Sequence, residues 1–195
     1  MLESQGYLSG DGQSRVTPAG RMLARIYAEL DLVAAECMRE GVLDDLTAPQ
    51  LAAVLSSLVF QSRRSDDGMR RPRMPDLRSN DAMTQVRAIW RNVSLVERDA
   101  RLPRAPEPDM GFAEIAYGWS AGRSLAAVLS DTDLTAGDFV RWVRQVTDFA
   151  GQVADAAGPG PLRETAHEVV RAMRRGVVTY SADDDEPAED LIELD

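Results

Sequence analysis

The stretch LTAGDFVRWVRQV, residues 134–146, places two arginines and a glutamine among large apolar residues. The guanidinium groups of Arg141 and Arg144 can form charge-assisted hydrogen bonds with anions, and the amide of Gln145 can donate or accept a hydrogen bond. The pattern fits a core helix with a solvated back, or a helix whose polar side chains face a bound partner.

This stretch begins with a helix-start signal. Thr135 and Asp138 have the spacing of a capping box, which predicts that a helix begins near Ala136. Within the polar stripe of this helix the arginines lie toward the N-terminal end, and Asp148 and Asp155 lie toward the C-terminal end, an order that the helix macrodipole does not favour. At about 100° per residue the polar side chains fall within an arc of about 120°, opposite a broad apolar side: Arg141, Arg144, Gln145, Asp148, Gln152 and Asp155.

The composition excludes several kinds of chemistry. All 22 basic residues are arginine, so the chain cannot supply the lysine of a phosphate-binding Walker A loop, of a Schiff base or of a lysine general base. Cys37 is the single cysteine, so no intrachain disulfide can form, and its apolar neighbours favour a small buried side chain over a reactive thiol. His167 has no partner at ligand spacing, which favours packing or surface exposure over a metal.

The negative charge is concentrated at the C-terminus. The net charge is −10, but eight of the 32 acidic residues lie after residue 182, which leaves 24 acidic against 22 basic groups in the rest. Residues 181–195 are expected to be a disordered acidic tail that aids solubility, with a docking peptide or a nucleic-acid mimic as the alternative. No apolar run has transmembrane length and no signal peptide is evident, so a cytoplasmic location without membrane contact is expected.

The elements that position these side chains are expected to be helices. Aromatic content of 6% with abundant alanine and leucine favours an all-α bundle, preceded by a short β-hairpin within residues 6–17. Loops are expected at 62–78, which has an excess of three positive charges, and at 101–109. The former is a solvated connector or a phosphate-contacting loop. About seven helices follow from apolar spacing and caps: Pro18 to Gly41 (one bent helix or two short ones), Thr47 to Phe60, a long helix capped by Ser79 or Asn80, short helices in 111–122 and 124–132, one from Ala136 to Ala157, and one from about Pro161 to Val178.

Several stretches of the chain resemble a known family. These are GYL and RVTPAGRMLARIYAELDLVAAECMREGVLDDLTAPQLAAVLSSLVFQ, then GFAEIAYGWSAGRSLAAVLSDTDLTAGDFVRWVRQV and LRETAHEVVRAMRRGVVTY. In this order they resemble the C-terminal helical domain (DSHCT) of DExH-box RNA helicases of the superkiller and exosome-cofactor type. The likeness is greatest to the actinobacterial branch called HelY.

The resemblance implies a domain organisation and a function. Residues 1–17 would be a remnant of a winged-helix region, residues 18–180 the helical bundle, and residues 181–195 the tail. The chain would be the accessory domain of an ATP-dependent RNA helicase, guiding single-stranded RNA, or DNA, past the motor. It would have no catalytic residue or cofactor of its own, because ATP and Mg²⁺ belong to motor domains outside this chain, which would be a fragment of the helicase.

The resemblance also implies which residues meet the strand. Arg141, Arg144 and Gln145 would face nucleic acid, with Gln61 and Ser62 nearby. Where the family often has a second basic residue this chain has Gln145, and where it often has an acidic one this chain has Ser62. The alternative is a non-enzymatic helical scaffold or protein-interaction module whose polar stripe is solvated.

Overall fold

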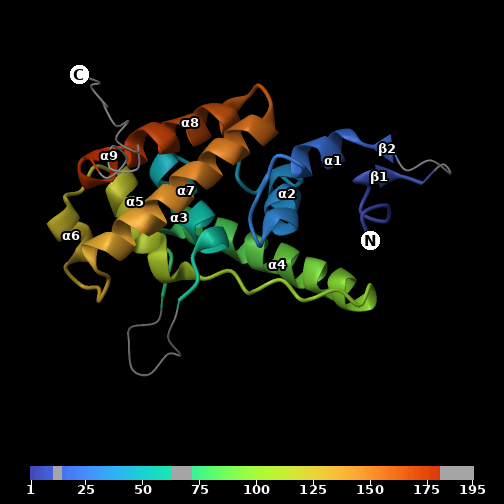
Figure 1. Ribbon diagram of the computed structural model, residues 1–195, viewed down its shortest axis with the longest axis horizontal. Helices are drawn as coiled ribbons and strands as arrows, with labels where there is room; N and C mark the ends of the chain where they lie inside the picture. The colour runs from blue at the N-terminus through green and yellow to red at the C-terminus, as the bar shows by residue number, and fades with distance from the viewer. Residues whose placement is uncertain (11–14, 63–71, 181–195) are drawn as a thin grey trace, which may run out of the picture.

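The computed structural model describes residues 1–10, 15–62 and 72–180, so the predictions for the basic segment 63–71 and for the acidic tail lie outside it. Within these ranges the chain is an all-α bundle with one antiparallel strand pair (Figure 1). In this pair Leu8 lies opposite Val16. The predicted fold class is confirmed. In chain order the elements are β1 Leu8–Ser9, β2 Arg15–Val16, α1 Pro18–Leu23, α2 Asp31–Arg39, α3 Ala48–Val59, α4 Leu77–Asp99, the 3₁₀ helix η1 Met110–Phe112, α5 Ala113–Ser120, α6 Leu125–Leu129, α7 Ala136–Ala157, α8 Pro161–Met173 and α9 Val177–Tyr180.

The described residues contain nine α-helices. Of the two alternatives for residues 18–41, the structure has two short helices, and the last expected helix is divided into α8 and α9. The first division separates α1 from α2, where the chain instead forms hydrogen bonds to α7. The second follows Met173, where Gly176 adopts a left-handed φ of 54°. There the Arg175 guanidinium donates to the carbonyl oxygens of Trp119 and Arg123, at 2.7 and 2.6 Å. Both breaks depend on contacts between distant parts of the chain.

The start of α4 differs from the prediction. The expected caps were Ser79 or Asn80, but the helix begins at Leu77 and its cap is Asp76. The Asp76 carboxylate accepts a hydrogen bond from the backbone N–H of Ser79 at 2.8 Å, as an N-cap side chain does. Ser79 itself is buried, so an apparent cap residue in the sequence is part of the first turn.

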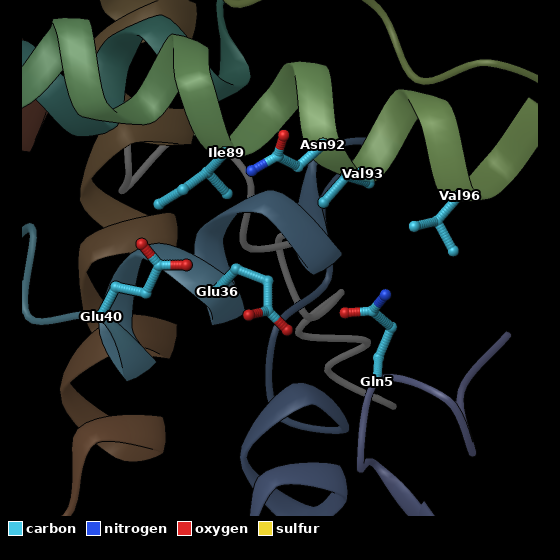
Figure 2. Close-up of a pocket in the computed structure, with 7 residues that line it drawn as sticks. All are labelled: Gln5, Glu36, Glu40, Ile89, Asn92, Val93 and Val96. Atoms are coloured by element: carbon cyan, nitrogen blue, oxygen red, sulfur yellow. The ribbon is translucent and has the colours of Figure 1, made fainter.

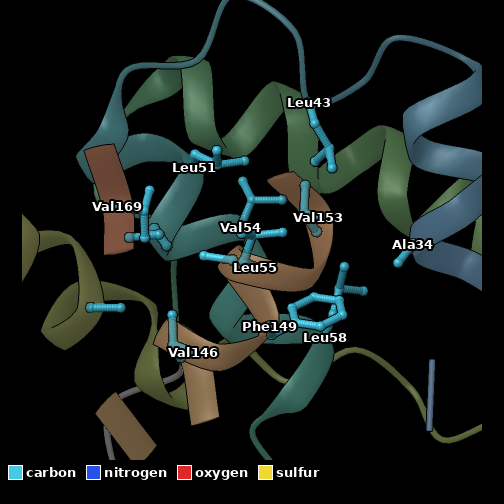
Figure 3. Packing of buried hydrophobic residues seen from close by; sticks show 14 of the residues in the cluster. Ala34, Leu43, Leu51, Val54, Leu55, Leu58, Val146, Phe149, Val153 and Val169 are labelled. Carbon is cyan, nitrogen blue, oxygen red and sulfur yellow. The ribbon is translucent and has the colours of Figure 1, made fainter. Parts of the chain in front are cut away.

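The core is built around α3, which contacts α4, η1, α5, α7 and α8. Residues 51–58 are all buried, as the nearly all-round apolar pattern predicts. Figure 3 shows Leu51, Val54 and Leu55 of α3 facing side chains of α7 and α8, such as Phe149 and Val169. Full burial of each large aliphatic side chain stabilises the fold by about 1.5–3 kcal/mol.

The N-terminal segment packs on the same bundle. Tyr7 is 1% exposed, its hydroxyl donates to Glu36 of α2, and the Arg39 guanidinium lies 5.1 Å from the centre of its ring. The strand pair is therefore joined to α2 by specific contacts. Among the described helices none combines the length and apolar character needed to cross a membrane.

Candidate nucleic-acid interface

Helix α7 begins where the sequence predicts. The Thr135 hydroxyl accepts a hydrogen bond from the backbone N–H of Asp138 at 3.1 Å, and it donates to the Asp138 carboxylate at 2.9 Å. The Asp138 side chain thus bonds the capping hydroxyl rather than the Thr135 N–H, a variant of the capping box. The apolar side of α7 is buried against α3 and α8, which fixes the direction of the polar side. The buried apolar residues include Phe139, Val143, Val146, Phe149, Ala150 and Val153.

The N-terminal half of the polar stripe is open to solvent. Arg141, Gln145 and Asp148 are exposed, and Arg144 is half-buried at the edge of the stripe. The predicted one-sided helix is therefore confirmed, and Arg141 and Gln145 are available to a partner. Their contact with nucleic acid stays a prediction.

Arg141 is held by two neighbours on its own helix. Its Nη2 donates to Asp138 Oδ1 at 3.1 Å, one helical turn before it, and its guanidinium lies 4.8 Å from the centre of the Trp142 ring. An exposed pair at this spacing contributes about 0.3–0.5 kcal/mol, so a phosphate could displace the Asp138 carboxylate at low cost. The pairing orients the arginine without burying it, since 42% of its side chain is exposed.

An aromatic contact joins the start of α7 to the end of α3. Phe60, which follows α3, packs edge-on against Trp142 with ring centres 4.7 Å apart, and it stacks on Phe112 at 5.6 Å. Phe60 directly precedes Gln61, and Trp142 directly follows Arg141. The structure thus brings both groups of predicted site residues to one neighbourhood, although it shows no direct bond between them.

Asp109 fixes the backbone at the end of α3. Its carboxylate accepts from the N–H of Ser62 at 2.7 Å and from the N–H of Gly111 at 2.8 Å, while its own N–H donates to the carbonyl of Ser57 at 2.9 Å. Gln61 is half-buried and Ser62 is exposed beside this anchor. The role of Asp109 is not evident from the sequence, where its one signal is its place just before a helical start.

The C-terminal half of the stripe forms hydrogen bonds with the segment between α1 and α2. The Gln152 side chain accepts the N–H of Tyr27 at 2.7 Å, and the backbone carbonyl of Asp155 accepts from the Arg25 guanidinium at 2.6 Å. These partners are 125 and 130 residues apart in the chain, so no local pattern could have indicated them. The polar arc predicted as one face therefore has two parts, an open one around Arg141 and an occupied one around Gln152.

A pocket elsewhere in the bundle has the wrong charge for phosphate. It lies between the N-terminal segment, α2 and α4, and Figure 2 shows the Glu36 and Glu40 side chains on one side of it, facing Ile89, Asn92 and Val93. Glu36 is bonded to Tyr7 and paired with Arg39 at 2.7 Å. Carboxylates repel phosphate, and no residue of α7 lines this pocket, so it is separate from the candidate interface.

Comparison with known proteins defines the class. The DSHCT (NUC185) domain family matches residues 13–181, which is most of this chain. The chain therefore belongs to the DSHCT domain family.

Among its relatives, "Probable helicase HelY" of Mycobacterium tuberculosis is 41% identical over 193 residues, and that of Mycobacterium leprae is 40% identical. Each match covers 93% of this chain but 21% of the relative, so the chain spans about a fifth of their length. The human "Exosome RNA helicase MTR4" is 26% identical over a match that covers 82% of this chain and 16% of the length of that protein. The family predicted from the sequence is confirmed.

Proposed function

We propose that this domain guides single-stranded RNA past the motor of an ATP-dependent DExH-box RNA helicase. The strand would lie across the start of α7, against Arg141, Arg144 and Gln145, and beside Gln61 and Ser62 at the end of α3. The observation that supports this most is the exposed Arg141 next to the Phe60–Trp142 contact, which joins the start of α7 to the end of α3. The relatives named as helicases support the assignment to a motor protein.

The side chains suit a sequence-tolerant contact. Arginine guanidinium groups pair with phosphates of any sequence, and Gln145 can hydrogen-bond a base or a phosphate without adding charge. Two phosphate contacts to a single strand give a slope of log K against log salt of about −1.4. Because the chain outside the tail is nearly neutral, affinity in the range of about 10⁻⁴ to 10⁻⁶ M is expected for the domain alone.

ATP hydrolysis would take place in other domains of the same helicase. This chain has no lysine for a Walker A loop, so it would contribute strand contacts and no catalytic residue. ATP and Mg²⁺ would bind in the motor domains, and the motor and winged-helix domains would be the direct neighbours of this bundle.

The test is the double substitution Arg141→Ala/Arg144→Ala in the full-length helicase. We expect a higher RNA concentration for half-maximal ATPase stimulation and slower unwinding, with the ATPase rate in the absence of RNA unchanged. The matched control is Arg91→Ala/Arg98→Ala, which removes two exposed arginines from α4. RNA-stimulated ATPase and unwinding at the unsubstituted level in the α7 double mutant would refute the assignment of this face.

A helical scaffold is the second candidate, favoured by one observation: Arg141 and Gln152 already have partners within the domain. In that case the polar stripe of α7 is solvated. The scaffold predicts no change in NMR shifts or in Trp142 fluorescence when single-stranded RNA is added, whereas the guiding role predicts changes confined to the start of α7 and the end of α3.

A further inference from the structure

Tyr27 presents an aromatic ring to solvent from a fixed segment. Its side chain is 77% exposed, although it lies between Ile26 and Leu30, which are 3% and 1% exposed. The apolar spacing through this region continues that of α1, yet the chain leaves the helix here. Tyr27 therefore contributes little buried area to the fold.

Helix α7 holds this segment in place. The Tyr27 N–H donates to the Gln152 side chain at 2.7 Å, and the Arg25 guanidinium donates to the Asp155 carbonyl at 2.6 Å. The first bond holds the backbone at Tyr27, the second attaches the Arg25 side chain to α7, and burial of Ile26 anchors the residue between them. An exposed ring on a fixed backbone loses little conformational freedom when it binds a flat ligand.

Tyr27 lies beside the C-terminal half of the polar stripe of α7, beyond the exposed half that contains Arg141. Gln152 lies three turns after Arg141 on the same side of α7, about 16 Å along the helix at 1.5 Å per residue. Along this path the charge changes from the arginines to the carboxylates of Asp148 and Asp155, which repel phosphate. Stacking of a base on an uncharged ring does not need positive potential, so it suits this end of the stripe.

We propose that Tyr27 is a stacking platform for a base of single-stranded RNA, so that the strand runs along α7 from Arg141 to Tyr27. Phosphates would pair with the arginines at the start of the helix, and a base would lie on the Tyr27 ring beside the exposed Arg25. This inference rests on the proposed RNA-guiding function and adds a second, uncharged contact to it.

The test compares Tyr27→Ala with Tyr27→Phe in the complete chain, by fluorescence anisotropy at low salt. The probe is a fluorescein-labelled oligo(A) of about 12 nucleotides. We expect Tyr27→Ala to weaken binding about 5-fold or more, as removal of a stacking ring does, and Tyr27→Phe to bind as the unsubstituted chain does. Leu77→Ala, which truncates another exposed side chain (84%), is the matched control and should leave binding unchanged.

A second probe separates stacking from other causes. An abasic ribose-phosphate strand of the same length should bind the Tyr27→Ala and unsubstituted chains equally, and Tyr27→Ala should leave the salt dependence unchanged. Arg141→Ala should instead lower the salt slope by about 0.7. If Arg141→Ala weakens oligo(A) binding and Tyr27→Ala does not, or if Tyr27→Ala weakens the abasic strand equally, the platform is refuted and the guiding function stands. If the unsubstituted chain binds no RNA, the guiding function fails as well.

Discussion

Gly20 offers the sharpest test of the packing between the N-terminal strand pair and α1. It lies inside α1, where replacing glycine by alanine ordinarily stabilises a helix by about 1 kcal/mol. The structure predicts the opposite sign, because a Cβ at this position would lie 2.2 Å from the backbone oxygen of Tyr7 and 2.8 Å from Val16 Cγ1. A backbone carbonyl cannot rotate away as a flexible side chain can.

The magnitude follows from what the Tyr7 carbonyl does. It accepts a hydrogen bond from the Thr17 N–H at 3.1 Å, which contributes about 0.5–1.5 kcal/mol. The single proton of the Thr17 hydroxyl lies closer to the Gly6 carbonyl oxygen, at 2.7 Å, than to that of Tyr7, at 3.0 Å, so it adds no separate bond here. Overpacking adds about 1–3 kcal/mol. After subtraction of the propensity gain, Gly20→Ala should lower the free energy of unfolding by about 0.5–3.5 kcal/mol.

The assay is urea denaturation followed by circular dichroism, with Gly151→Ala as the matched control. Gly151 lies inside α7 and a Cβ there would meet nothing within 4 Å, so this substitution should raise stability by up to about 1 kcal/mol. Faster hydrogen exchange of the Thr17 amide in Gly20→Ala would locate the damage. If Gly20→Ala is as stable as the unsubstituted chain, the close packing of α1 on Tyr7 is wrong.

Two further predictions concern buried side chains. In Gly111→Ala the new Cβ would lie 2.6 Å from Phe60 Cε1, so the Phe60 ring should move away from Trp142. We expect a changed near-UV circular dichroism spectrum and a free energy of unfolding lower by about 1–3 kcal/mol. An unchanged spectrum would contradict this. Burial raises the pKa of the Cys37 thiol from 9.0 to about 12, so the thiol should react with Ellman's reagent only through unfolding. Between pH 9 and 12 the unfolded chain loses this proton and the folded chain keeps it, so stability should fall as pH rises, and Cys37→Ala should reduce that dependence.

Local signals in the sequence were enough for the central helices. The Thr47 and Thr135 caps and the apolar periodicity after them predict α3 and α7, because a cap and a buried face are determined within one element. At α4 the sequence predicts Ser79 or Asn80 as the cap, whereas the actual cap, Asp76, lies three residues before Ser79. Capping residues therefore predict the presence of a helix start more reliably than they predict the exact residue at which the helix begins.

Contacts between distant segments account for what the sequence did not show. The sequence leaves open one helix or two in residues 18–41, and the segment between α1 and α2 forms bonds with Gln152 and Asp155, over a hundred residues away. The packing of Phe60 against Trp142, which joins the end of α3 to the start of α7, also has no local signal. A helical wheel ranks the faces of one helix, but it does not tell which part of a polar face another segment will cover.

The bond between Ser62 and Asp109 also affects how this domain can vary. These residues are 47 positions apart, yet 2.7 Å separates the bonded atoms, so the two ends of a segment that includes α4 are fixed to each other. The cost of closing a longer loop rises by about 0.6 kcal/mol for each doubling of length. Residues 101–104 are all exposed after α4. Insertions there should be tolerated without moving the end of α3 or the start of α7. This connection is therefore a suitable place to fuse a reporter, and a position where homologues can differ in length.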